Sequence, residues 1–259
     1  MSRAPDQPLR LQSRLNRELT GYLAHVGLAG HLARYVAARR PEERSLTVED
    51  DGSIVAVSVS GIEFGLHEVP SYWLFSERPA AIRLLARELD RRSRAQLNFP
   101  LHFTDVVAEC IGTRLVRVDR LYALVPSHFR PCPSRHAIRR LDQEGIEGVE
   151  IPEELRGLIG RTADWEPGFQ IEGIVDEGRL VAMGETMVRD EHAAAIQQIY
   201  TIESRRRSGL ARELLVELAR GLMETGLTAT YLVEEENSAS WGLAESIGFS
   251  LDSRWGYVA

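Results

Sequence analysis

The stretch Gln197–Ala211, QQIYTIESRRRSGLA, joins a strand-like segment to an amphipathic, helix-like one. Residues 195–202 are mostly apolar, and residues 210–225 repeat apolar side chains at helical spacing. The connecting loop contains Arg206-x-x-Gly209-x-Ala211. At a helix start the first backbone N–H groups lack partners and lie at the positive end of the helix dipole. Because small residues at 209 and 211 let a phosphate approach the backbone, the loop predicts a diphosphate site.

Arginines at 205, 206, 207 and 212 add positive charge to this loop. The alternative interpretation is a solvated basic turn at the start of a helix, which would bind nothing. The three-residue pattern has little weight alone in a chain rich in Arg, Gly and Ala. Its place between a strand and a helix gives it significance.

A second segment, Glu236–Phe249, follows the next strand-like run and reads ENSASWGLAESIGF. Asn237 and Ser238 are good N-cap residues for a short helix, and Gly248 is a good residue to end it. The simpler interpretation is a well-capped helix that buries Leu243 and Ile247, and this does not conflict with a binding role.

Together the two segments resemble the GNAT acyltransferase superfamily. The family pattern has a strand, an Arg/Gln-x-x-Gly-x-Gly/Ala loop, a helix, a strand, Asn-x-x-(Ala/Ser), a helix and Gly-Phe. The matching residues, in order, are Thr201, Arg206, Gly209, Ala211, Asn237, Ser240, Gly248 and Phe249. The resemblance is specific over residues 169–259, and residues 46–125 show only the same layout.

The resemblance implies a GNAT fold, an α/β (α+β) mixed sheet with splayed central strands flanked by helices. It implies that acyl-CoA lies in the gap where Ala195–Ile202 splays from Thr228–Glu234. The residues expected to contact the cofactor are Tyr200, Thr201, Ile202, Arg206, Arg207, Ser208, Gly209, Leu210, Ala211, Arg212, Asn237 and Ser240. The pantetheine arm is expected to pair with strand backbone as an added strand would.

The implied activity is transfer of an acyl group, most simply acetyl from acetyl-CoA, to a primary amine of a small molecule or peptide. Three departures from the family pattern qualify it. Ala244 stands where many members have a tyrosine acid, Glu203 stands where proline is common, and one strand follows Phe249 where many members have two. A catalytically inactive CoA-binding regulatory module is the alternative, and a protein that binds no CoA is a third.

Amine acylation requires removal of a proton from the amine, so a carboxylate base is expected near the cofactor strand. Glu185, on the strand before it, and Glu203, at its end, are the candidates. For each, a solvated surface charge is the alternative. Ser240 lies one helical turn before Ala244 and is the candidate to protonate the leaving thiolate, although water could also do so.

Composition excludes several other classes. The net charge of −7 argues against a nucleic-acid partner, and all 31 basic residues are arginine. No apolar run is long enough to cross a membrane, and residues 1–14 do not form a signal peptide. Cys110 and Cys132 are too few and too far apart for a metal cluster. We expect a cytoplasmic protein, with a homodimer possible.

The order of expected elements indicates duplication. Strand–helix–strand–helix–strand from Tyr72 to Val125 parallels the order from Ala195 to Val258. The proline-rich segment 126–134 is the expected linker, which gives a degenerate GNAT-like domain at 1–130 and a GNAT acyltransferase domain at 136–259. Glu77 and Pro79 precede the first-half helix, so we expect no CoA site there. Residues 11–40 are expected to be helical.

Overall fold

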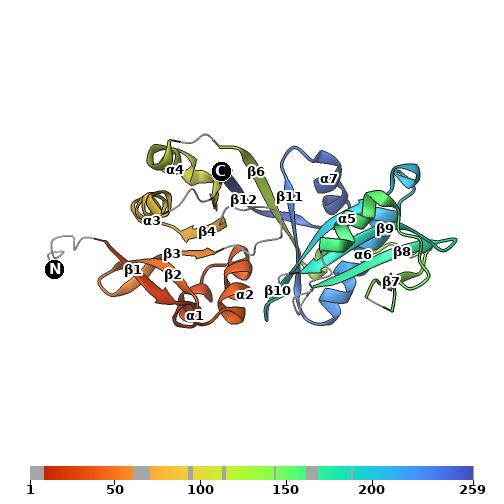
Figure 1. The fold of residues 1–259 in the computed structure, drawn as a ribbon, viewed down its shortest axis with the longest axis horizontal. Coiled ribbons are helices and arrows are strands. Elements are labelled where there is room, and N and C mark those ends of the chain that lie inside the picture. Colours follow the sequence, from red (N-terminus) through yellow and green to blue (C-terminus); the bar gives the residue numbers. More distant parts are fainter. Residues whose placement is uncertain are drawn as a thin grey trace. The chain divides into compact units, whose positions relative to one another are not determined.

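The computed structural model describes residues 9–60, 71–92, 96–112, 115–142, 144–161, 169–187 and 189–258 (Figure 1). The chain divides into two compact units. Unit 1 contains Met1–Asp119 together with Ser253–Ala259, and unit 2 contains Arg120–Asp252. Each unit has a sheet, covering helices and a hydrophobic core of its own.

Unit 1 is a six-stranded sheet of order β1-β2-β3-β4-β5-β12, in which β4 and β5 are parallel and the other neighbours antiparallel. Its elements are β1 (Arg10–Leu15), α1 (Thr20–Leu23), α2 (His31–Arg39), β2 (Arg44–Asp50), β3 (Ser53–Ser60), β4 (Ser71–Ser76), α3 (Pro79–Arg92), β5 (Gln96–Pro100) and α4 (Thr104–Ile111). Helix α3 buries Ile82, Leu85 and Leu89 in the core of this unit. The Ser76 hydroxyl accepts the N–H of Arg78 at 3.0 Å, just before α3 begins at Pro79.

The predicted helix over residues 11–40 is wrong at its start. Residues Arg10–Leu15 form β1, which pairs antiparallel with β2 from Arg10↔Glu49 to Leu15↔Arg44. Leu11 and Leu15 are four residues apart, a spacing that suits a helix. Pairing with β2 outweighs this local pattern, because it satisfies the backbone while Leu11 still packs on the core of unit 1.

Unit 2 has the strand order β6-β11-β10-β9-β8-β7. Its elements are β6 (Arg117–Leu124), β7 (Ile138–Arg140), α5 (Glu153–Arg161), β8 (Gln170–Asp176), β9 (Arg179–Met187), β10 (Ala193–Thr201), α6 (Leu210–Glu224), β11 (Thr228–Glu234), α7 (Ser238–Ile247) and β12 (Ser250–Val258). Strands β10 and β11 are parallel, whereas β8, β9 and β10 form an antiparallel meander.

Two strands are divided between the units. β6 begins in unit 1 and passes into unit 2 at Arg120, and β12 begins in unit 2 and passes into unit 1 at Ser253. In unit 1 the last residues of β12 pair with β5, from Trp255↔Pro100 to Val258↔Leu97. In unit 2, β6 lies next to β11. The strand expected to be missing after Phe249 is therefore supplied by a segment from the first half of the sequence.

The proline-rich segment 126–134 lies inside unit 2, although it was expected to link two domains. Arg130 donates its backbone N–H to Ile247 O at 2.8 Å, at the end of α7. A Cβ on Gly248, whose φ is +109°, would lie 1.9 Å from His128 O. Gly248 thus ends α7 and also gives this segment room to pack. The domain limits 1–130 and 136–259 remain a prediction.

The units repeat one order of elements. In chain order, β2, β3, β4, α3, β5, α4 and β6 are followed by the same series in β8, β9, β10, α6, β11, α7 and β12, and the last strand of each series is divided between the units (Figure 1). In both units the third strand of the series pairs parallel with the fourth. The fold class is a mixed α/β sheet flanked by helices, as expected.

Candidate functional site

The parallel strands β10 and β11 separate part-way along their length. They pair from Ala193↔Thr228 to Ile196↔Tyr231, and the pairing ends there although β10 continues to Thr201 and β11 to Glu234. Beyond Ile196 one edge of β10 carries backbone groups that no strand pairs. Such an edge can accept an extended ligand as an additional strand.

A β-bulge in β10 begins at the point of separation. Gln197 is opposite Glu185 of β9, but the next paired residue, Tyr200, is opposite Met183. Gln198 and Ile199 therefore share one partner position, and Gln198 has a φ of +53°, in the left-handed region. An extra residue bends a strand and redirects its backbone groups, and bulges are enriched near active sites.

The loop after β10 ends in an open helix start. Gly209 is the N-cap of α6 with a φ of +90°, and Arg207 has a φ of +63°. Within the described residues, the backbone N–H groups of 207–211 make no hydrogen bond. A Cβ added to Gly209 would meet nothing within 4 Å, so the space above this turn is open. The structure thus places unpaired donors at the positive end of a 15-residue helix, as an anion site requires.

The four arginines of this loop have different roles. The Arg206 side chain lies against the end of β10, where it donates to Tyr200 Oη at 3.3 Å and to Thr201 O at 3.4 Å. Arg205 pairs with Asp176 and Arg212 with Ser246. Arg207 is exposed and has no ion pair among the residues described. Among the described residues, Arg205 is the one of the four paired with a carboxylate, so Arg206, Arg207 and Arg212 keep positive charge for a ligand.

The start of α7 carries the second segment. The Asn237 side chain caps the helix by accepting the N–H of Ser240 at 3.2 Å, which leaves its amide N–H groups available. The Ser240 hydroxyl lies 2.6 Å from the phenol oxygen of Tyr231. Tyr231 is the last residue of β11 that pairs with β10, so this hydroxyl pair lies where the two strands separate.

Glu185 is buried in β9, directly opposite Gln197. Its side chain is 1% exposed, and its Oε1 atom has no hydrogen-bond partner. Gly184 faces Leu214 and Leu218 of α6, so strand alternation directs Glu185 to the opposite face of the sheet. Burial raises the pKa of Glu185 to about 7. A carboxyl group in this state can exchange a proton at neutral pH.

The other two catalytic candidates differ in their surroundings. Glu203 is exposed at the first position of a 3-10 turn, Glu203–Arg205, and lies on the loop rather than in the sheet. Ser240 shares its hydrogen bond with Tyr231 as described. Glu185 therefore lies opposite Gln197, the last residue of β10 before the bulge, and Ser240 lies where β10 and β11 separate. Glu203 lies on an exposed turn outside the sheet.

The comparisons with known proteins agree with this geometry. Residues 172–258 match the family model described as FR47-like protein. A GCN5-related N-acetyltransferase from Sphaerobacter thermophilus superposes with a TM-score of 0.62 at 13% identity, over 96% of this chain and 94% of that one. The chain has a GNAT fold.

Two further solved structures match nearly the whole chain. A tandem GNAT protein from the clavulanic acid biosynthesis pathway has a TM-score of 0.60 at 13% identity, over 96% of this chain and 97% of that one. A Drosophila protein has a TM-score of 0.68 at 17% identity, over 96% and 98%. No curated protein matches the sequence. At these identities the structural likeness concerns the fold alone, and it extends over both units of the chain.

Tyr231 is a residue of this candidate site that was not predicted from the sequence. It is 3% exposed, and burial raises the pKa of its phenol. Ala244, at the position where GNAT proteins often carry tyrosine, is fully buried and offers no hydroxyl. The signal for Tyr231 was its place in the strand before Asn237, but its partner Ser240 follows nine residues later, across a turn.

No cluster of His, Cys, Asp or Glu suited to a metal ion occurs among the described residues. Within the same residues, the helices are all too short or too polar to cross a membrane.

Proposed function

We propose that this chain is an acyl-CoA-dependent N-acyltransferase that uses acetyl-CoA and acylates a primary amine of a small molecule or peptide. The observation that carries the proposal is the open start of α6 at the end of a strand that separates from its parallel neighbour. Unpaired N–H groups at 207–211 and the empty space above Gly209 suit a diphosphate. The free edge of β10 suits an extended amide-containing arm.

The residues present fit such a cofactor. Arg206 and Arg207 provide positive charge beside the helix start, and Arg206 is held in place by Tyr200. Thr201 has a buried hydroxyl without a hydrogen-bond partner at the end of β10. Asn237 has amide donors that its capping bond leaves available. When bound, acyl-CoA supplies an activated acyl thioester, and the chain supplies its position and the proton transfers.

We assign the base to Glu185. With a pKa of about 7 it is substantially ionised at neutral pH, and its carboxylate can accept the ammonium proton of the acceptor, directly or through water. Gln197 lies beside it in the sheet, where β10 begins to bend. Glu203, exposed on the loop, remains the alternative base.

We assign assistance to the leaving group to the Tyr231–Ser240 hydroxyl pair. One of the two hydroxyls donates to the other, and the remaining proton can be directed at a departing sulfur. A thiolate has an ordinary pKa near 8.5, so a hydrogen bond suffices and complete proton transfer is not required. This pair would replace the tyrosine that position 244 lacks.

The proposal is tested in two stages. Calorimetry of the full chain with acetyl-CoA establishes binding, and release of free thiol with a panel of primary amines establishes transfer. Binding with amine-dependent thiol release supports the enzyme. Binding without transfer to any amine favours the regulatory module, for which buried Ala244 is the specific observation. Absence of binding contradicts both.

A further inference from the structure

Unit 1 contains a cavity of about 630 Å³ that the proposed acyl transfer does not use. Its lining comes from the α1–α2 region, from β3 and β4, from the loop before α3 and from β12. All of these residues belong to unit 1, because β12 enters this unit at Ser253. The volume lies in the range of small-molecule sites, about 300–1,000 Å³.

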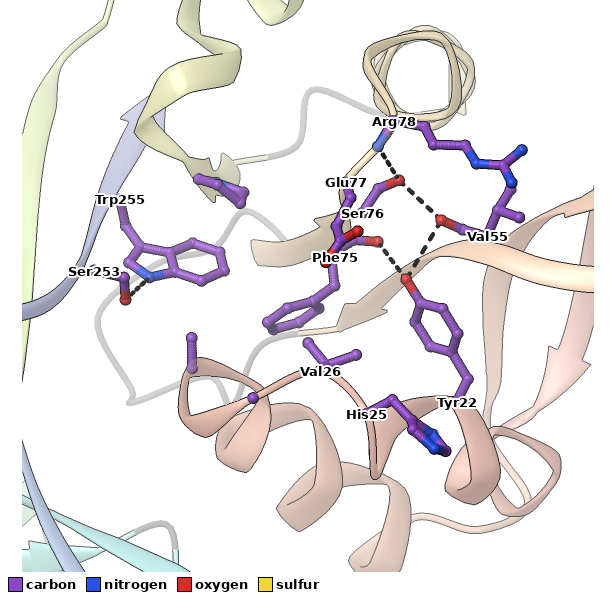
Figure 2. A pocket seen from close by; sticks show the side chains of 13 residues that line it. Tyr22, His25, Val26, Val55, Phe75, Ser76, Glu77, Arg78, Ser253 and Trp255 are labelled. Carbon is purple, nitrogen blue, oxygen red and sulfur yellow. Dashed lines mark hydrogen bonds between the residues drawn. The ribbon is translucent and has the colours of Figure 1, made fainter.

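Three aromatic side chains, Tyr22, Phe75 and Trp255, form part of the cavity wall. The rings of Phe75 and Trp255 lie edge to face with centroids 5.4 Å apart (Figure 2). On the other side of Phe75, the Tyr22 phenol donates to the carbonyls of Phe75 and Val55 at 3.3 and 3.4 Å (Figure 2). These bonds fix the Tyr22 ring and remove its hydroxyl from use as a ligand donor. The cavity therefore presents π faces and edges held in place.

The carboxylate of Glu77 stands at the exposed rim. It lacks an ion-pair or hydrogen-bond partner among the described residues. Burial raises the pKa of the Tyr22 phenol, and the nearby negative charge of Glu77 raises it further. The lining guanidinium, Arg78, is paired with Asp50 at 2.5 Å. His25 turns its Nδ1 atom to Gly21 O at 2.7 Å. Glu77 is therefore the charged residue of the lining whose carboxylate a ligand could pair with.

The same loop is unsuited to a phosphate. Pro79 has no N–H, the Arg78 N–H is bonded to Ser76 Oγ, and the N–H groups of residues 81 and 82 are bonded to Arg78 O. A carboxylate at the rim also repels an anion. The cavity therefore does not suit a phosphate, unlike the corresponding loop of unit 2, where we propose that a diphosphate binds.

We propose that this cavity binds an organic ammonium compound with an apolar body. Aromatic rings stabilise a cation through their quadrupole, and an unpaired carboxylate adds direct attraction. The apolar part of the ligand would lie against Phe75, Val26 and Val55, with its ammonium group toward Glu77. The site is independent of the proposed cofactor site, because every lining residue lies in unit 1.

The test uses calorimetry on the full chain at low salt, without acyl-CoA. Three probes of similar shape carry different charge: phenethylamine, phenethyl alcohol and phenylacetate. We expect phenethylamine to bind most tightly. Glu77→Gln should weaken it roughly threefold to tenfold and leave the alcohol unchanged. The matched control is Glu109→Gln, which removes an exposed carboxylate from α4 of the same unit.

Location is tested with Ala29→Phe, which fills the cavity from its helical wall and should abolish binding of phenethylamine. Equal binding of amine and alcohol, preference for phenylacetate, or absence of binding would each overturn the proposal. So would a loss of affinity in Glu185→Gln but not in Glu77→Gln, since the amine would then occupy unit 2. A calorimetric loss in Glu77→Gln alone supports unit 1, whatever the fate of the acyltransferase.

Discussion

The strand pairs β4–β5 and β10–β11 begin alike and end in different chemistry. Both are parallel, and both separate: β4–β5 after Trp73↔Asn98, and β10–β11 after Ile196↔Tyr231. In unit 2 the strand is followed by a loop with a left-handed glycine and unpaired N–H groups. In unit 1 it is followed by Ser76-Glu-Arg-Pro79, in which the Arg78 N–H is bonded to Ser76 Oγ and Pro79 has no N–H.

The registers extend the comparison to the neighbouring strand. One position beyond the last parallel pair, β9 presents Glu185 opposite Gln197, whereas β3 presents Ser58 opposite Leu74. The β3–β4 register is continuous, while β10 carries a bulge at the same stage. The two units therefore share a parallel strand pair that separates part-way. The proposed acid–base groups, the bulge and the anion donors occur in unit 2.

The largest expected effect comes from Gly209→Glu. A carboxylate in the open space above the helix start should repel a diphosphate and lower acetyl-CoA affinity at least about a hundredfold. Because unit 1 lacks the donors, calorimetry should find one site in the parent protein and none in the variant. Half the sites remaining would show that unit 1 also binds acetyl-CoA.

A matched glycine controls for backbone strain in that experiment. Gly226 follows α6 with a φ of +79° and, like Gly209, has nothing within 4 Å of an added Cβ. Gly226→Glu should incur a similar cost of about 1 kcal/mol in unfolding free energy and keep its affinity for acetyl-CoA. Equal loss of binding in both variants would assign the effect to unfolding.

The next effect concerns the base, which unit 1 lacks at Ser58. Glu185→Gln should lower kcat by roughly tenfold to a thousandfold at neutral pH and leave acetyl-CoA affinity nearly unchanged. In the parent protein kcat should rise with pH through about 7, as the carboxyl loses its proton. The variant should lose this step and recover part of its rate at high pH, where more amine is neutral.

Glu203→Gln is the matched control for the base, since it removes a carboxylate from the exposed turn of the same unit. It should keep the parent pH profile. If Glu203→Gln lowers kcat and Glu185→Gln does not, the base lies on the loop. The difference between Glu185 in unit 2 and Ser58 in unit 1 would then not explain catalysis.

A smaller effect should be seen in stability. The pKa of Glu185 is raised in the folded protein, so between about pH 4.5 and 7 the unfolded chain ionises first and folding becomes less favourable as pH rises. Glu185→Gln should therefore increase the free energy of unfolding by about 2 kcal/mol at pH 8. Urea titrations at pH 4 and pH 8 would measure it.

The increase in unfolding free energy caused by Glu185→Gln should disappear at pH 4, where the Glu185 carboxyl is protonated in both the folded and the unfolded state. Ser58→Ala is the counterpart in unit 1, because its hydroxyl is also buried without a partner, and its effect should not depend on pH. A pH-independent difference in Glu185→Gln would mean that folding does not raise the pKa of Glu185.

Local patterns accounted for much of the fold and the loop, because those features depend on neighbouring residues. The Gly209 turn, the Asn237 cap and the Gly248 stop are set by backbone conformations that few residues adopt. The exchange of β6 and β12 between the units could not be predicted, since strand pairing across more than a hundred residues leaves no local pattern.

The site was predictable where its residues follow a strand or begin a helix. Glu185 could be placed on a strand, but its burial depends on both faces of β9 being covered, which sequence spacing does not show. The bulge at Gln198 has no marker in the sequence Gln-Gln-Ile. Tyr231 was missed because its interaction with Ser240 requires the turn between β11 and α7 to be known.

The smallest expected effect tests the hydroxyl pair at the point where β11 separates from β10, where unit 1 instead carries Asn98 bonded to Ser71. Tyr231→Phe should lower kcat about twofold to tenfold, with little change in acetyl-CoA affinity. If the two hydroxyls act as one donor, Ser240→Ala should cost about as much, and the double variant little more. Tyr122→Phe is the control, since it removes another buried phenol from unit 2. A rate loss in Tyr122→Phe equal to that in Tyr231→Phe, or additive losses at 231 and 240, would show that packing rather than a shared hydrogen bond sets the rate.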